Sequence, residues 1–483
     1  MRSKRPSCEW PRLGDRFDAA VGYDPAVFLQ TLPSPPEIEA ALLRFAAWPR
    51  VVLLDSARRG DRQSQWSFLT AAPLRTQTID AGGRDAIEPR RDRRLPAEAP
   101  PFCGGLVGVL SYEFGLGLEA SLHRPSIDEF GLPVAELAEY DWALAWNHAD
   151  GTCWLAAEDD GRAADVRRTL RGDPPPDGEW VERFPRGAPV TIRSPQHPLD
   201  DDASEHLVSN FTRDGYLNAV EAMRQAIAAG DIFQANLAQR LLARPDVDPL
   251  TLYRRLRRRS PAPMAAFVDA GSYRLLSTSP ERFLKIDARH IETRPIKGTY
   301  RRVARPEADL FTRDALRESA KDRAENVMIV DLLRNDLSRV CQTGSMRVPS
   351  LCQIETFANV QHLVSVVTAD LRDDLTPLDA LLATFPGGSI TGCPKIEAMN
   401  WIAKLEQVAR GPYCGSLFYW GYERDGVGAA FDSSILIRTV IDAGGWWQLP
   451  VGGGITWPSD PAGEYQETLD KATAMRSAIA HSD

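Results

Sequence analysis

Residues 431–457 read FDSSILIRTVIDAGGWWQLPVGGGITW. Residues rich in β-branched and aromatic side chains fill 431–440 and 446–451, which predicts two strands. Further strand-like runs lie at 51–54, 104–110, 232–242, 273–278 and 416–422. Apolar residues at helical spacing predict helices over 214–229, 306–340, 395–407 and 461–480. Runs of strands with interspersed helices indicate an α+β fold and not a doubly wound parallel sheet.

The composition is that of an ordinary globular protein, with 483 residues of which 43% are hydrophobic and 25% charged. A net charge of -9 disfavours binding to nucleic acid or to an anionic membrane. The basic run within 254–259 is interpreted as a solvated helix face in preference to a partner patch. Neither a signal core nor a membrane-spanning apolar stretch is visible, and seven cysteines without a Cys-x-x-Cys pair indicate reduced thiols. We therefore expect a cytoplasmic protein.

A change in composition divides the chain. Residues 172–206 hold three consecutive prolines at 174–176 and three aspartates at 200–202, and they predict a Pro/Asp-rich linker. The linker separates an N-terminal domain at 1–171 from a catalytic domain at 207–483.

Two pairs of acidic residues lie three apart in predicted helices, Asp322 with Glu325 and Glu464 with Glu467. This spacing places both side chains of a pair on one helix face. Four oxygen ligands without a nearby cysteine suit a hard cation such as Mg²⁺. The alternative is a solvated acidic face, in which Glu467 forms an ordinary i,i+4 pair with Lys471.

Two glycine-rich segments are candidate ligand sites. Residues 386–395 read PGGSITGCPK just before a predicted helix, which makes either an anion cradle or a structural turn. Gly452, Gly453 and Gly454 expose backbone N–H groups to a ligand or form a bulge.

Three polar side chains stand in strand-like surroundings. Arg438 needs either an anionic ligand or a structural ion pair, because an unpaired buried charge is very costly. Lys297 lies beside Gly298 and is either a nucleophile or a surface cation. His362, in an apolar segment, is either a satisfied core residue or a catalyst.

Together these segments resemble the chorismate-utilising family, which includes anthranilate, aminodeoxychorismate, isochorismate and salicylate synthases. The resemblance is dense from 207 to 480 and looser before that. It is carried by seven ordered motifs, at 233–240, 279–283, 294–299, 322–326, 331–336, 386–395 and 452–471. It implies an α+β fold with two interleaved halves around a β-sandwich flanked by helices.

The resemblance also implies roles for the candidate residues. Glu325 and Glu467 match ligands of a magnesium ion that holds the ring carboxylate of chorismate, with Glu464 and Asp322 as outer-shell candidates. Arg438 and the glycines 452–454 match the family's residues that hold the enolpyruvyl carboxylate of chorismate; these glycines are Gly452, Gly453 and Gly454. His362, Thr299 and Thr391 match residues that line the substrate. Lys297, Thr299 and His362 are the candidate catalytic residues.

Two positions distinguish the branches of this family. Members that add water carry a lysine where this chain has Gln234. Anthranilate synthases carry alanine where this chain has Lys297, whereas the Pro-Ile-Lys-Gly-Thr form resembles the branch that aminates chorismate at C4. In that branch the lysine is thought to attack C2 and expel the C4 hydroxyl, after which ammonia adds at C4 and displaces the lysine. A nucleophilic lysine must be partly neutral.

The expected partners follow from the same resemblance. Cys393 replaces an expected alanine, and a small thiol should fit there. Because no Gly-x-Cys-x-Gly glutaminase stretch is visible, we expect ammonia from a separate glutamine amidotransferase subunit. Leu54 and Ser56 resemble part of a tryptophan pocket that several relatives hold between their sheets. The alternatives are an anthranilate synthase component and a non-catalytic chorismate or tryptophan sensor.

Overall fold

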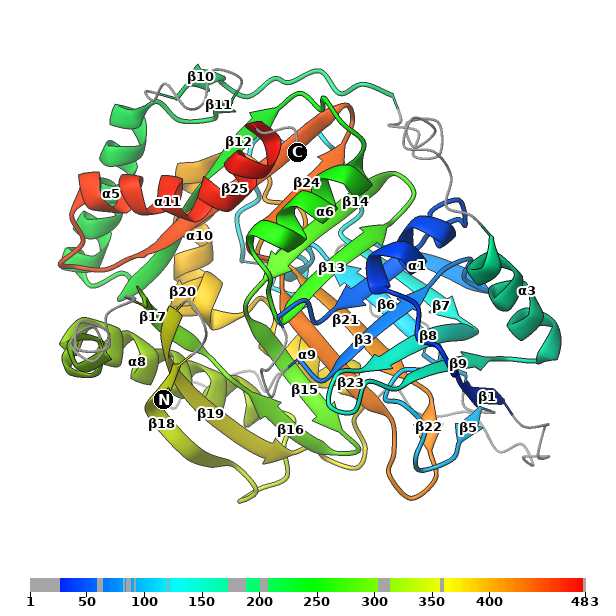
Figure 1. The fold of residues 1–483 in the computed structure, drawn as a ribbon. Coiled ribbons are helices and arrows are strands. Elements are labelled where there is room, and N and C mark those ends of the chain that lie inside the picture. Colours follow the sequence, from blue (N-terminus) through cyan, green and yellow to red (C-terminus); the bar gives the residue numbers. More distant parts are fainter. Residues whose placement is uncertain are drawn as a thin grey trace.

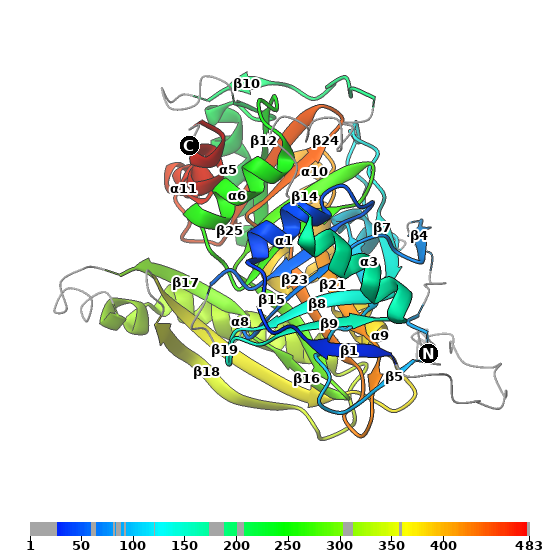
Figure 2. The same cartoon turned by 45° about the vertical axis from the view of Figure 1, so that its right-hand side comes forward.

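The computed structural model describes residues 27–58, 64–80, 83, 88–90, 93–119, 121–172, 188–199, 207–302, 313–356 and 360–480. Two large sheets form the centre of the molecule, and helices cover the outer face of the larger one (Figures 1 and 2). All strand pairs described in these two sheets are antiparallel. The expected α+β class is confirmed.

The larger sheet combines strands from both ends of the chain. In spatial order they are β1 (Phe28–Thr31), β9 (Cys153–Ala157), β8 (Trp142–Asn147), β3 (Trp66–Thr70), β2 (Val52–Asp55), β13 (Met264–Asp269), β14 (Tyr273–Ser279), β24 (Thr439–Ala443), β25 (Trp446–Ile455), β12 (Gln234–Ala243), β11 (Val208–Ser209) and β10 (His197–Pro198), with β20 (Gly392–Cys393) paired to the start of β12.

The smaller sheet is also mixed in chain origin. Its order is β17 (Ile296–Arg301), β19 (Val360–Asp370), β16 (His290–Thr293), β15 (Arg282–Asp287), β23 (Ala430–Ile435), β21 (Ser416–Gly421), β6 (Gly105–Leu110), β7 (Ala135–Tyr140) and β4 (Arg75–Ile79), with β18 (Arg347–Thr356) also paired to β19. A separate short parallel pair joins β5 (Arg94–Leu95) to β22 (Glu423–Arg424).

The helices are α1 (Ile38–Phe45), α2 (Tyr112–Leu116), α3 (Asp160–Arg171), α5 (Arg213–Ala229), α6 (Pro249–Arg259), α8 (Ala320–Leu337), α9 (Pro377–Thr384), α10 (Lys395–Glu406) and α11 (Pro461–Ala480). Among the described residues, none of these helices is long and apolar enough to cross a membrane.

The two halves of the chain are interleaved. In the larger sheet, β2 pairs with β13, so that Leu54 lies opposite Ala266. In the smaller sheet, β6 pairs with β21, so that Gly108 lies opposite Phe418. The expected interleaving is therefore confirmed, and the sheets cross the boundary between the two predicted domains.

Strand alternation builds two separate cores. On β8, Ala143 and Ala145 face the core between the two sheets, whereas Trp142 and Leu144 face the core beneath the helices. All four side chains are fully buried. The larger sheet is thus buried on both faces, which explains the near-continuous apolar runs of its strands.

Two segments differ from their sequence-based predictions. The strand expected at 431–440 is two strands, β23 and β24, because the backbone turns at Arg438, where φ is 51°. Conversely, the strand expected at 446–451 continues through Gly452–Gly454 to Ile455 with an unbroken register against β12. The bulge alternative for the glycines is therefore wrong. The first part of the helix expected over 306–340, residues 306–312, lies outside the described residues, and α8 begins at Ala320.

The basic run on α6 is mostly not a solvated face. Arg257 donates to Asp55 at 2.5 Å and pairs with Glu39, and Arg254 contacts Glu39 as well. Arg255 is only 5% exposed and donates to the carbonyl of residue 478. The contacts of Arg254 and Arg257 tie α6 to the N-terminal half, and that of Arg255 ties it to α11. The prediction of a solvated helix face was therefore wrong for these three arginines.

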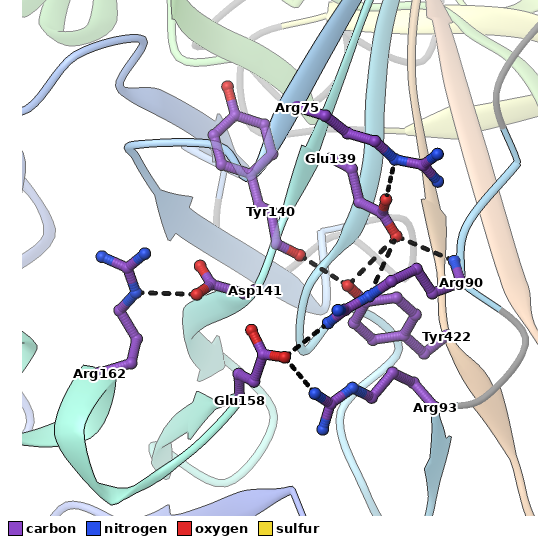
Figure 3. Close-up of polar contacts among 9 residues, drawn as sticks. All are labelled: Arg75, Arg90, Arg93, Glu139, Tyr140, Asp141, Glu158, Arg162 and Tyr422. Carbon is purple, nitrogen blue, oxygen red and sulfur yellow. Dashed lines mark hydrogen bonds and ion pairs between the residues drawn. The ribbon is translucent and has the colours of Figure 1, made fainter.

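A polar cluster joins the two halves at the end of β7 (Figure 3). Glu139 is fully buried and accepts from Arg75 Nε at 2.5 Å and from the backbone N–H of Arg90 at 2.9 Å. The Arg90 guanidinium pairs with Glu158 at 3.0 Å. Tyr422, from the C-terminal half, donates to Glu139 at 3.5 Å and to the carbonyl of Tyr140 at 3.0 Å. Full burial of Glu139 is tolerated because several donors surround it.

Most of the predicted linker at 172–206 falls on 173–187 and 200–206, which lie outside the described residues. The intervening part follows the edge of the larger sheet. Val190 donates to Gly444 O at 2.8 Å, and β10 pairs with β11.

Candidate active site

Lys297 lies at the centre of a cluster of candidate residues. It is carried by β17, its side chain is 14% exposed, and its Nζ lies 3.9 Å from Glu325 Oε2 on α8. The same Nζ donates to the carbonyl of Ser389 at 3.4 Å. The next residue, Gly298, has a φ of 70°, and a Cβ there would lie 2.9 Å from Asp322 Cγ. Glycine thus allows the start of α8 to pack against the lysine-bearing turn.

Strands β12 and β25 contribute two further residues of the cluster, Gln234 and Gly454. Gln234 is 1% exposed, and a Cβ at Gly454 would overlap its side-chain amide and lie 3.8 Å from Lys297 Nζ. The side-chain oxygen of Gln234 is buried without a hydrogen-bond partner. Gln234, Lys297 and Gly454 therefore meet at one point, although they are far apart in the sequence.

The predicted metal-binding carboxylates lie on α8 and α11 next to this point. One oxygen each of Glu325 and Glu464 is buried without a hydrogen-bond partner. Burial raises the pKa of both carboxyls above the ordinary value. Partial burial also acts to raise the pKa of Glu467, but Lys471, Lys321 and Lys297 hold it below its usual value.

Lysines accompany these carboxylates. Glu467 accepts from Lys471 at 2.7 Å, which is the i,i+4 pair foreseen from the sequence, and Lys321 lies 3.9 Å from Glu464. Within the described part of the chain, no three acidic, histidine or cysteine side chains are gathered closely enough to hold a metal ion. The spare oxygens of Glu325 and Glu464 nevertheless suit a cation, since a buried carboxylate oxygen needs a donor or a metal.

Glu281 is a further member of the cluster that was quoted in a sequence motif without a role. It is 7% exposed, and Ser389 Oγ donates to its Oε1 at 3.0 Å. Burial raises the pKa of Glu281 to about 7, against the opposing charge of Lys297. A carboxyl with that pKa is a candidate general acid near neutral pH. The signal available in the sequence was a glutamate three residues after the end of the strand predicted at 273–278.

The remaining predicted residues line the periphery of the cluster. His362 is buried, and burial together with Arg58 and Arg438 lowers its pKa to about 4, so the imidazole is neutral at pH 7. Arg438 donates to the carbonyl of Lys471 at 3.1 Å, and burial lowers its pKa. Among the described residues no carboxylate lies within ion-pair distance of Arg438, so the structural ion pair considered from the sequence is absent there.

Two predicted threonines are placed differently. Thr391 is fully buried and donates its hydroxyl to Gly387 O at 2.9 Å. The backbone of Thr299 pairs with His362 in the ladder of β17 and β19, and its side chain lies outside the described part of the structure.

Buried ion pairs hold the loop at 386–395 in place. Arg410 and Glu406 pair at 2.6 Å, and Arg410 also donates to the carbonyls of Ile390 and Asn236. Lys395 pairs with Asp336 at 2.7 Å. These contacts anchor the loop on β12, and Lys395 is engaged within the fold.

A separate cavity of about 420 Å³ lies between the two sheets. Leu54 and Ser56 line it, as the sequence resemblance suggested, together with the aromatic residues Trp66, Phe68 and Tyr419. Ser56 donates to the carbonyl of Pro263 at 3.3 Å.

Comparison with known proteins shows the family of the chain. The chorismate binding enzyme family matches residues 49–477, which is most of the chain. The chain belongs to this family. Its relatives in the family include aminodeoxychorismate synthase component 1 of Klebsiella aerogenes, 40% identical over 78% of this chain and 77% of that protein, and that of Escherichia coli, 35% identical over 89% and 94%.

Other relatives in the family carry different names. An aminodeoxychorismate synthase of Streptomyces griseus is 42% identical over 77% of this chain, and the chain spans 50% of its length. Anthranilate synthase component 1 of Thermus thermophilus is 34% identical over 94% of this chain and 96% of that protein. The crystal structure of anthranilate synthase component I from Streptococcus pneumoniae superposes with a TM-score of 0.68 at 29% identity, covering 85% and 92% of the two chains. The family resemblance and fold inferred from the sequence are confirmed, and the chain is a chorismate-utilising enzyme.

Proposed function

We propose that this enzyme aminates chorismate at C4 with ammonia to give 4-amino-4-deoxychorismate, a precursor of 4-aminobenzoate and folate. The observation that carries the proposal is the position of Lys297. Lys297 contacts both Glu325 and Ser389 O and lies next to the buried amide of Gln234, which supports a role for its amine as a nucleophile. The names of several relatives, aminodeoxychorismate synthase component 1, support the same reaction.

In the first step the Lys297 amine forms a bond to C2 of chorismate. The two conjugated ring double bonds shift, and the hydroxyl leaves C4 as water with a proton from the Glu281 carboxyl. In the second step ammonia bonds to C4, the double bonds shift back, and the Lys297 amine leaves C2. Each step forms one bond to nitrogen and breaks one bond at the other ring position, so the enolpyruvyl group is retained.

The carboxylates of α8 and α11 are proposed to hold a magnesium ion that binds the ring carboxylate of the substrate. Glu325 and Glu464 are favoured as direct ligands because each has a buried oxygen without a partner. Glu467 and Asp322 are assigned to supporting positions, since one oxygen of Glu467 already pairs with Lys471. This differs from the sequence-based assignment, which placed Glu467 ahead of Glu464.

The second carboxylate of chorismate requires a cation on the opposite side of the site. Arg438 is proposed for this role, because its charge is buried and no carboxylate of the described residues pairs with it. The backbone of Gly452–Gly454 provides room for the enolpyruvyl group. Neutral His362 is proposed to donate or accept a hydrogen bond to substrate without adding charge.

Ammonia is proposed to come from a separate glutamine amidotransferase subunit in the cytoplasm. The printed names of the relatives describe a component 1, which supports a multi-subunit enzyme. The cavity between the sheets is proposed to hold tryptophan, because its aromatic walls fit an indole and its volume fits one amino acid. Mass analysis of the denatured, purified chain would detect a bound amino acid.

Product identification tests the proposed reaction. The purified chain is incubated with chorismate, magnesium and an ammonium salt at raised pH, and the products are separated by chromatography with mass detection. A product that retains the enolpyruvyl group is expected. Anthranilate with released pyruvate would instead support the second candidate, anthranilate synthase, which the 34% identity to the Thermus thermophilus protein keeps in consideration. The absence of turnover would support the sensor alternative.

A further inference from the structure

A second hollow, of about 250 Å³, lies beside the start of α8, the helix that carries Glu325. It is formed by helical residues 313–318, the start of α8 and the middle of β18. Its lining residues are Arg313, Arg317, Arg323, Leu351, Cys352, Gln353 and Ile354. Three of these seven residues are arginines, and no acidic residue is among them.

The three arginines gather around one hollow without compensation of their charges by residues that the structure describes. Among the described residues, no carboxylate lies within ion-pair distance of Arg313, Arg317 or Arg323. By contrast, Arg257 and Arg410 each pair with a carboxylate. Three guanidinium groups around one hollow repel one another, and an anion between them would remove that repulsion.

The chemistry of the hollow selects the kind of anion. Guanidinium groups bind carboxylate and phosphate oxygens through paired N–H donors, and three of them suit a group with more than one negative charge. Gln353 adds a further donor, while Leu351 and Ile354 provide apolar walls. We infer that this hollow binds a compact multivalent anion through carboxylate or phosphate oxygens.

Binding here would act on the candidate active site through direct packing. Leu316, on the helical segment that carries Arg313 and Arg317, is fully buried, and a Cβ at Gly298 would lie 2.7 Å from its Cδ1. Arg323 lies two residues before Glu325 on α8, and the Cys352 thiol donates to its carbonyl at 3.9 Å. An anion that draws the arginines together therefore holds helical residues 313–318 against the turn that carries Lys297.

The test is a calorimetric titration of the full chain with inorganic pyrophosphate in magnesium-free buffer. The pocket variant combines Arg313→Gln, Arg317→Gln and Arg323→Gln. The control combines substitutions at three exposed arginines elsewhere, Arg124→Gln, Arg171→Gln and Arg259→Gln, and loses the same formal charge. We expect the pocket variant to bind pyrophosphate at least about tenfold more weakly than the unmodified chain, and the control to remain within about threefold.

Two results would overturn the inference: equal binding by the pocket variant and the unmodified chain, or equal weakening by the control, which would indicate a net-charge effect. Hydrogen exchange of the unmodified chain provides a measurement that does not depend on a variant that folds. Pyrophosphate should protect amides at 313–323 and 351–354, and protection confined to other segments would refute the site.

A further measurement, on the complex of the chain with its amidotransferase subunit, identifies where the anion comes from. If acidic side chains of the amidotransferase subunit occupy the hollow, the complex with that subunit will lose pyrophosphate binding and the pocket variant will associate more weakly. If a dissolved anion is the ligand, the complex will bind pyrophosphate as the isolated chain does. None of these measurements uses chorismate, so their outcome is independent of the reaction proposed above.

Discussion

Substitutions at Lys297 can test whether its amine acts as a nucleophile or only as a positive charge. The 3.9 Å between its Nζ and Glu325 Oε2 corresponds to a Coulomb attraction of about 4 kcal/mol at an effective dielectric constant of about 20. Lys297→Arg keeps this charge but removes the nucleophilic amine, whereas Lys297→Ala removes both. A purely electrostatic Lys297 therefore predicts that the arginine variant retains most of the rate.

A nucleophilic Lys297 predicts a different result. Both variants should lose at least about 10³-fold in kcat, which corresponds to about 4 kcal/mol in activation free energy. The arginine variant should keep its KM within about threefold, while the alanine variant should show a raised KM because Glu325 loses its counter-charge. Initial rates with chorismate, magnesium and ammonium measure both constants. Lys404→Arg, on α10 over the Trp401 ring, is the matched control and should leave the rate unchanged.

The outcome that would refute the reasoning is an arginine variant with more than about a tenth of the normal kcat. Intact mass measurement of quenched reactions adds an independent readout, since the unmodified chain should carry a substrate-derived adduct that neither variant forms.

Three further predictions concern other residues. Glu281→Gln should lower kcat about 10²-fold or more. In the unmodified chain, kcat/KM at constant free ammonia should fall above about pH 7, because the Glu281 carboxyl must be protonated to act as an acid. If the variant shows the same fall in kcat/KM above about pH 7, Glu281 is excluded as the acid. Glu464→Gln should raise the magnesium concentration needed for half-maximal rate about tenfold or more, and an unchanged magnesium titration would exclude direct ligation. Arg410→Ala should lower the free energy of unfolding, measured in urea titrations, by about 3–5 kcal/mol, because it leaves the buried Glu406 carboxylate unpaired. Arg168→Ala removes one partner of an exposed pair and should lower it by less than about 1 kcal/mol. Similar values for both variants would contradict the burial of the Arg410–Glu406 pair.

Elements with local signals were predictable from the sequence. Helix α11 begins where Asp460 caps Gly463 N–H at 2.8 Å and Pro461 fits the first turn. Helix α5 ends before Gly230, which adopts a left-handed φ of 85°. In both cases the deciding residues are adjacent in the chain, so the sequence contains the whole signal.

Features set by distant partners were not predictable in this way. The break at Arg438 depends on where β23 and β24 find their neighbours in two different sheets. The properties of Glu281 depend on burial and on Ser389, which is 108 residues away. The resemblance pointed to Lys297, Glu325 and Arg438 as site residues. The buried oxygen of Glu464 that lacks a hydrogen-bond partner is visible only in the fold.

The pairing of β2 with β13 has a consequence for synthesis on the ribosome. Leu54 and its neighbour Ala266 are 212 positions apart, since 266 minus 54 is 212. At roughly 5–20 residues per second, the N-terminal strand emerges roughly 10–40 s before its partner exists. During that interval its backbone is an open edge that invites pairing with other chains. Nascent chains arrested before residue 264 should therefore depend on chaperones, and the earliest stable native core should form only after β13 has left the ribosome.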